Sequence, residues 1–131
     1  VEGGNGNDTL AGGTGNDVLI GGFGADQFRF DTLANATTNL DTIVDFQSGK
    51  DHIQLENAAF TAFTATGALP AGSLVSGAGV TAAIDGNDFL LFDSSTGALY
   101  YDPDGTGASP ATQFAMLKGH PAIVAADFLV T

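Results

Sequence analysis

Three blocks of nine residues, rich in glycine and aspartate, follow one another without a gap near the start of the chain. They begin at Gly3, Gly12 and Gly21, and each has the order Gly-Gly-x-Gly-x-Asp-x-(large apolar)-x. Glycine at three of six positions permits positive φ angles, so a tight turn can aim several carbonyl oxygens into one small space. The aspartate adds a short carboxylate. An oxygen-only ligand set of this kind suits Ca²⁺.

The candidate ligands are the second, third, fourth and sixth residues of each block. They are Gly4, Asn5, Gly6, Asp8, Gly13, Thr14, Gly15, Asp17, Gly22, Phe23, Gly24 and Asp26. One six-residue turn cannot surround an ion, whereas two stacked turns can. The last three residues of each block form a short strand, so two blocks complete one circuit of a coil. We therefore expect one calcium ion between residues 3–8 and 21–26. The turn with Asp17 shares its ion with a turn before Gly3 or after Phe30.

These blocks resemble the RTX family, the calcium-binding nonapeptide repeats of bacterial proteins secreted by the type I pathway. The resemblance implies an all-β fold, a parallel β-roll with calcium between successive turns, followed by a C-terminal β capping region. A flexible glycine-rich linker is the alternative, but a linker has no reason to place aspartate and a large apolar residue at the same phase three times.

Residues 41–55 predict either a hairpin or two successive strands of the coil, with Gly49 in the turn. Asp41, Asp45 and Asp51 cluster around this turn. The pattern resembles the segment that closes the β-roll in serralysin-type proteases and alginate epimerase modules, which implies that some of these aspartates complete the last calcium sites. They can equally be turn residues that cap strands. Asp45 is the first choice as a ligand, because an unpaired carboxylate within a strand is costly to bury.

The second half of the chain carries fewer signals. Residues 57–83 predict loops and short irregular elements, and the runs 89–92 and 98–101 predict a hairpin. The segment 102–107, Asp-Pro-Asp-Gly-Thr-Gly, has part of the spacing of an EF-hand loop, but Gln113 stands where that loop needs glutamate. A plain β-turn is the favoured interpretation. We expect a roll in residues 1–56 and a cap in residues 57–131, within one continuous domain.

Composition narrows the function classes. The chain of 131 residues has 15 acidic and three basic residues, a net charge of −12, and 13 of the acids are aspartate. Such a chain lacks the basic patches that nucleic acids and anionic membranes require, and it has no long apolar stretch for membrane insertion. It has no cysteine, so disulfides and thiolate metal sites are excluded. Bound calcium can supply the stabilisation that secreted domains often take from disulfides.

No catalytic motif is recognisable. The two histidines, His52 and His120, are far apart and lack a zinc-binding helix pattern, and there is no Gly-x-Ser-x-Gly or phosphate-binding loop. Val1 and Glu2 fit the end of an earlier block, so we expect the C-terminal piece of a longer protein. The end of the chain, Asp127 with Phe-Leu-Val, resembles the C-terminal signal of type I secretion substrates.

These observations predict a non-catalytic, extracellular, calcium-binding module. It folds when it meets calcium outside the cell, and it carries the signal that the type I secretion machinery reads on behalf of an upstream domain. The alternatives are a polysaccharide-binding or adhesin module, or the non-catalytic tail of a secreted protease, lipase or epimerase.

Overall fold

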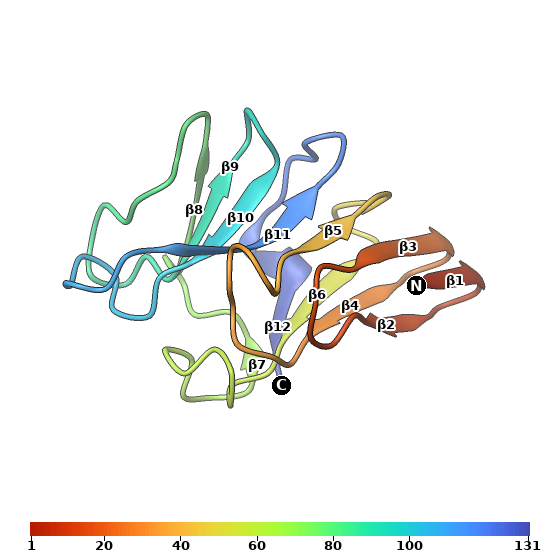
Figure 1. Ribbon diagram of the computed structural model, residues 1–131, viewed down its shortest axis with the longest axis horizontal. Helices are drawn as coiled ribbons and strands as arrows, with labels where there is room; N and C mark the ends of the chain where they lie inside the picture. The colour runs from red at the N-terminus through yellow and green to blue at the C-terminus, as the bar shows by residue number, and fades with distance from the viewer.

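The computed structural model describes residues 1–131, and the molecule is built from two packed β-sheets (Figure 1). The seven-stranded sheet has the order β1-β3-β5-β11-β10-β9-β8, and the five-stranded sheet has the order β2-β4-β6-β12-β7. The elements are β1 (Glu2–Asn5), β2 (Thr9–Ala11), β3 (Val18–Phe23), β4 (Gln27–Phe30), β5 (Asp41–Ile43), β6 (His52–Leu55), β7 (Gly67–Ala68), β8 (Leu74–Gly77), β9 (Leu90–Asp93), β10 (Ala98–Tyr101), β11 (Thr112–Leu117), the 3₁₀ helix η1 (Ala125–Asp127) and β12 (Phe128–Val130).

The first six strands wind as a coil. Odd strands lie in one sheet and even strands in the other, and each strand pairs in parallel with the strand two positions later. Gly4 lies opposite Gly22, and Leu10 lies opposite Phe28. This is the parallel β-roll that the nine-residue blocks predict. Since β5 and β6 belong to different sheets, residues 41–55 are successive strands of the coil and not a hairpin.

The rest of the chain extends both sheets of the roll. β11 pairs in parallel with β5, placing Ala115 opposite Asp41, and β12 pairs in parallel with β6, placing Phe128 opposite Ile53. The predicted hairpin is confirmed, because β9 and β10 are antiparallel neighbours. Residues 57–83 are largely irregular, as expected, with the short strands β7 and β8 among their turns. The C-terminal region therefore shares its sheets with the roll.

The apolar residue at the eighth position of each block points between the sheets. Leu10, Leu19 and Phe28 are at most 2 % exposed. Beyond the roll the space between the sheets is filled by aromatic rings. Phe114 on β11 packs edge-on against Phe30 and Phe60, with ring centroids 5.1 and 5.0 Å apart. Such pairs add to the large apolar area that aromatic side chains bury, so the core is continuous from the roll into the cap.

The short 3₁₀ element η1 is the only helical segment of the molecule. No helix here combines the length and the apolar character needed to cross a bilayer.

Candidate metal centre

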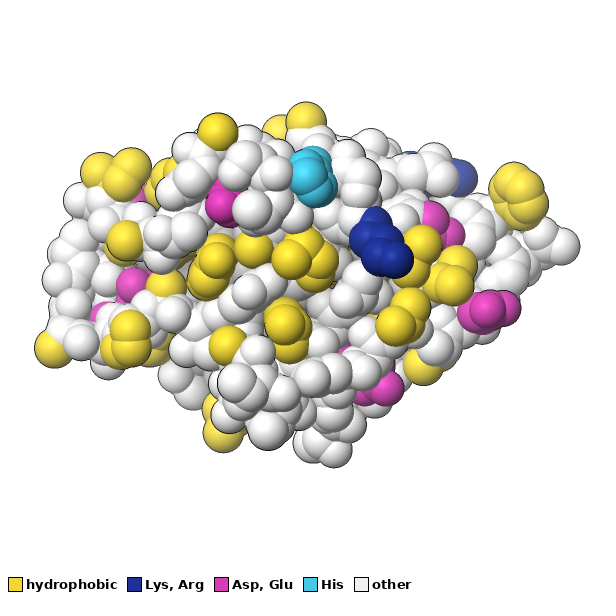
Figure 2. Space-filling model, turned by 45° about the horizontal axis from the view of Figure 1, so that its top comes forward, with side chains coloured by type: hydrophobic (Ala, Val, Ile, Leu, Met, Phe, Trp, Pro, Cys, Tyr) yellow, Lys and Arg dark blue, Asp and Glu magenta, His cyan; other side chains and the backbone are white.

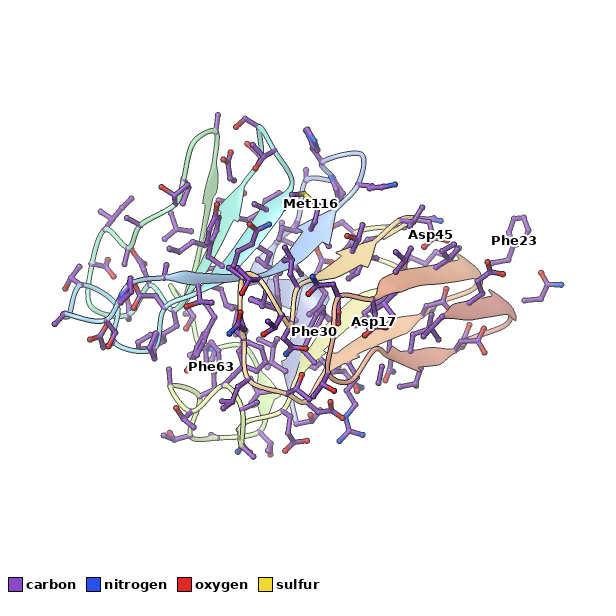
Figure 3. All side chains as sticks on the ribbon, viewed as in Figure 1. Asp17, Phe23, Phe30, Asp45, Phe63 and Met116 are labelled. Carbon is purple, nitrogen blue, oxygen red and sulfur yellow. The ribbon has the colours of Figure 1, made fainter.

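The turns of the roll line up along its two edges. At one edge the chain passes from the seven-stranded sheet to the five-stranded sheet through residues 3–8, 21–26 and 45–51. At the other edge it returns to the seven-stranded sheet through residues 12–17 and 31–41. Figure 3 shows Asp17 and Asp45 at opposite edges, with Phe23 pointing away into solvent at the tip of the roll. The glycines at the second and fourth positions of every block have positive φ, between 82° and 142°. This left-handed backbone is the reason that these positions are glycine.

The first and third blocks stack as predicted. The backbone N–H of Asp8 donates to Asp26 Oδ1 at 2.9 Å, and Gln27 N donates to the Asp8 carbonyl at 2.8 Å. In the side chain of Asp8, the carboxylate oxygen Oδ2 is buried and has no hydrogen-bond partner. It points over Gly3, where an added Cβ would lie 2.7 Å from Asp8 Oδ2 and 2.7 Å from the Gly21 carbonyl oxygen. A carboxylate oxygen and a carbonyl oxygen thus converge on one place.

The second block stacks on the turn after Phe30, one of the two predicted partners. Asp17 N donates to Asp41 Oδ1 at 3.0 Å, while Gly15 N donates to Asn39 Oδ1 at 3.2 Å. Asp17 Oδ2 is also buried without a partner. A Cβ on Gly12 would lie 2.8 Å from Asp17 Oδ2 and 2.9 Å from Asp41 Oδ2. Two carboxylate oxygens therefore lie close together at this edge.

The electrostatics of this second pair favour a cation. Burial raises the pKa of Asp41, and the neighbouring charge of Asp17 raises that pKa further, although the hydrogen bond from Asp17 N lowers it. Like charges held together in a partly desolvated turn destabilise the ionised form. A divalent cation between the two carboxylates removes this cost.

The closing turn 45–51 differs from the other turns. Asp45 follows β5, and its two oxygens accept hydrogen bonds from Gly21 N and Gly22 N, each at 2.8 Å. Asp51 accepts from Asp26 N at 3.0 Å and from Gln47 N at 2.8 Å. Both carboxylates are satisfied by backbone donors, so the cost of an unpaired carboxylate no longer argues for Asp45 as a ligand. A calcium ligand role for Asp45 and Asp51 stays a prediction.

The donor set fits calcium only if the backbone takes part. Nowhere does the structure bring together three or more His, Asp or Glu side chains that can hold a metal ion. Each stacked pair of turns offers two carboxylates together with the carbonyl oxygens of glycine-rich backbone. The buried, unpartnered oxygens of Asp8 and Asp17 are the sign that these pairs suit a hard cation, because buried polar atoms are normally satisfied.

Two features of the site lie outside the predicted ligand set. The first glycine of each block leaves room for the aspartate five residues later. A Cβ added at Gly3, Gly12 or Gly21 would lie 2.7, 2.8 or 2.5 Å from the Oδ2 atom of that aspartate. The recurrence of this glycine in all three blocks is the sequence signal for its role. Asn39, which bonds to the second turn, lies in an irregular stretch that carries no repeat signal.

Residues 102–107 form a turn, in agreement with the favoured interpretation. Asp104 N donates to Asp102 Oδ1 at 3.2 Å, and Ser109 N donates to Asp104 Oδ2 at 3.0 Å. Burial raises the pKa of Asp102, whereas the bond from Ser109 N lowers the pKa of Asp104.

Comparison with known families points in the same direction as the geometry. The family described as peptidase M10 serralysin C terminal matches residues 7–79, more than half of the chain. The match begins inside the first block and extends through the roll to β8. A search of curated proteins finds no match.

Proposed function

The chain belongs to the peptidase M10 serralysin C-terminal family, a family of calcium-binding RTX β-roll domains of secreted proteins, and from this premise we propose how it works. It is a non-catalytic module that folds when it binds calcium outside the cell. It exports a larger protein through the type I secretion machinery, and its C-terminal residues carry the signal. An upstream domain of the parent protein supplies any catalytic activity.

The observation that carries this proposal is the pair of buried, unpartnered carboxylate oxygens, Asp8 Oδ2 and Asp17 Oδ2. One ion would be held by Asp8 and Asp26 with carbonyl oxygens of their turns. A second would be held by Asp17 and Asp41 at the opposite edge. A third would lie between residues 21–26 and 45–51. When bound, calcium neutralises carboxylates that otherwise repel one another.

The energy available is sufficient to decide whether the domain folds. Extracellular calcium modules bind with Kd of about 10⁻⁴–10⁻³ M, and calcium outside cells is near millimolar. A site whose ligand is present at about one to ten times Kd stabilises the folded state by roughly 0.4–1.4 kcal/mol. Two or three such sites together contribute roughly 1–4 kcal/mol, which is enough to decide whether a marginally stable domain folds. A net charge of −12 adds self-repulsion when calcium is scarce.

We also propose that residues 1–56 form the roll and residues 57–131 its cap. Two observations support this division within one domain. β11 and β12 continue the two sheets of the roll, and the ring of Phe114 packs between Phe30 from the roll and Phe60 from the cap. The cap thereby covers the end of a roll that is too short to bury a core alone.

A polysaccharide-binding role has less support. Of the three basic residues, Arg29 lies 3.2 Å from Glu56 and 3.7 Å from Asp31, which leaves only two lysines to contact an anionic polymer. Basic side chains are also few on the face that Figure 2 shows, where acidic side chains are spread among apolar ones. Titration with alginate tests this alternative, and saturable binding would favour it.

Two buried aspartates provide a matched test of the calcium sites. Asp26 and Asp93 are 1 % and 5 % exposed, and each accepts a hydrogen bond from a backbone N–H, but only Asp26 lies in the stacked turns. We expect Asp26→Ala to lower the number of bound calcium ions counted by native mass spectrometry. Asp93→Ala should leave this number unchanged. Equal losses in the two variants would remove the claim that the nonapeptide turns hold the ions.

A further inference from the structure

A buried carboxylate outside the stacked turns has no part in the calcium sites described above. Asp127, the last residue of η1 and directly before β12, is 1 % exposed. Its Oδ2 accepts hydrogen bonds from Ser48 Oγ at 2.6 Å and from Val124 N at 2.9 Å, and its Oδ1 accepts from Gly49 N at 2.9 Å. Burial of an ionised carboxylate is costly unless it is well bonded, and this one accepts from three donors.

Two of those donors belong to the closing turn of the roll. In the turn 47–51, Asp51 bonds back to Gln47 N and across to Asp26 N, which joins the turn to the third block. The tip of the same turn, Ser48 and Gly49, is exposed, and Gly49 has φ +81°. The hydrogen bonds of this tip to the rest of the protein go to Asp127. The turn is therefore held on one side by the roll and on the other by Asp127, the residue directly before β12.

We propose that Asp127 is a positioning residue that couples docking of β12 to calcium binding by the roll. It keeps the tip of the turn 47–51 in place, so that Asp51 reaches Asp26 and the third turn pair keeps its shape. Coupling of this kind is reciprocal: a docked β12 strengthens calcium binding, and bound calcium strengthens docking. The inference rests on the proposed function, since it assumes that the stacked turns bind calcium.

The coupling has a consequence for the C-terminal end. Phe128 and Val130 are 1 % and 2 % exposed, and β12 is an interior strand of the five-stranded sheet, between β6 and the edge strand β7 (Figure 1). In the calcium-loaded protein the terminal segment is masked. When the turn is loose, the segment is free to leave the sheet. Calcium thus controls access to the last residues through Asp127.

The test uses the full chain and a double-mutant cycle. Asp127→Asn places an amide NH₂ group where the native carboxylate only accepts hydrogen bonds. Ser48→Ala removes the hydroxyl that donates to Asp127. A hydrogen bond to a charged group is worth about ten- to a hundredfold in the folding equilibrium constant. If three ions bind on folding, this corresponds to a calcium midpoint raised about two- to fivefold. The double variant should shift the midpoint no further than the larger single shift.

Val130→Ala is the control, because it loosens β12 without a bond to the turn. Its effect should add to that of Ser48→Ala. Amide exchange in calcium gives the second measurement. Asp127→Asn should speed exchange at the Asp26 and Gln47 amides, which donate to Asp51, by more than Val130→Ala, which leaves the hydrogen bonds of Asp127 in place. Unchanged exchange at these two amides, or an additive Asp127–Ser48 cycle, would overturn the proposal.

A C-terminal exopeptidase tests the masking. In calcium the unaltered chain should keep its last residues, and Asp127→Asn should lose them several times faster. Equal rates would contradict the masking. If the unaltered chain folds without calcium, the proposed function fails, but the amide-exchange comparison still decides whether Asp127 holds the turn.

Discussion

The first prediction concerns Asp17, because its carboxylate should destabilise the folded state without calcium and stabilise it with calcium. Asp17 Oδ2 is buried without a partner, and it faces Asp41 Oδ2 over Gly12. Without calcium, this arrangement destabilises the folded state by repulsion. With calcium, the same two oxygens bind the ion. Asp17→Asn removes the charge and leaves the backbone N–H that donates to Asp41 Oδ1 in place.

The magnitude follows from the geometry. The two oxygens lie 2.8 and 2.9 Å from one point, so they are at most about 6 Å apart, and at an effective dielectric constant of about 20 their charges repel by about 3 kcal/mol. Asp17→Asn should therefore stabilise the calcium-free fold by up to that amount. Loss of the site should remove about 1.4–2.7 kcal/mol of the calcium-induced stabilisation.

The assay is urea unfolding followed by circular dichroism, in chelator and in 10 mM calcium (roughly ten to a hundred times the expected Kd), with the same concentration of a stabilising osmolyte in both arms. We expect the two unfolding free energies of Asp17→Asn to lie closer together than those of the unaltered chain. Asp31→Asn is the control: it removes one charge at an exposed position beside Arg29 and should leave the calcium-induced stabilisation unchanged. A lower stability of Asp17→Asn in chelator would refute the reasoning.

Three further predictions concern the backbone, the core and acid stability. Gly13→Ala should cost roughly 1–2 kcal/mol in thermal unfolding, from positive-φ strain alone, because a Cβ at Gly13 meets open space. Gly24→Ala should cost clearly more, because a Cβ at Gly24 meets the backbone of the stacked turn. Equal costs for the two variants would argue against tight stacking of the turns. Phe114→Ala should lower the melting temperature in calcium by roughly 10–20 °C, and a change of a few degrees would mean that roll and cap do not share a core. The Ser95 hydroxyl, followed by the Gly79 amide, lowers the pKa of Asp93 to about 2. The ionised Asp93 carboxylate thus stabilises the folded protein above about pH 4, and this stabilisation is lost as the pH falls towards 2. Ser95→Ala should raise this pKa in a carboxyl NMR titration and make the loss shallower, and an unmoved pKa would contradict the assignment.

The local parts of the fold could be predicted from the sequence because the repeat encodes them. A strict block dictates its turn, the inward direction of Leu10, Leu19 and Phe28, and the stacking of alternate blocks. The hairpin of β9 and β10 is equally local. The pairing of β11 with β5 and of β12 with β6 joins segments more than 70 residues apart, and no local pattern specifies such parallel partners.

The candidate site shows the same division. The order that recurs in the three blocks predicts Asp8, Asp17 and Asp26, and the structure places all three in stacked turns. The roles of Asp45 and Asp127 depend on distant donors, namely the backbone of the third block and the closing turn. A carboxylate close to apolar residues has the same sequence signature whether it binds a metal or caps a turn, so the sequence does not separate these roles.

The central claim is that calcium drives folding of the β-roll. Far-ultraviolet circular dichroism of the full chain, recorded in excess chelator and again after addition of calcium, tests it most directly. We predict a largely unfolded spectrum in chelator and a cooperative change to a β-sheet spectrum as calcium approaches millimolar concentration, with no comparable change in equal magnesium. A full β-sheet spectrum in chelator that calcium leaves unaltered would contradict the claim.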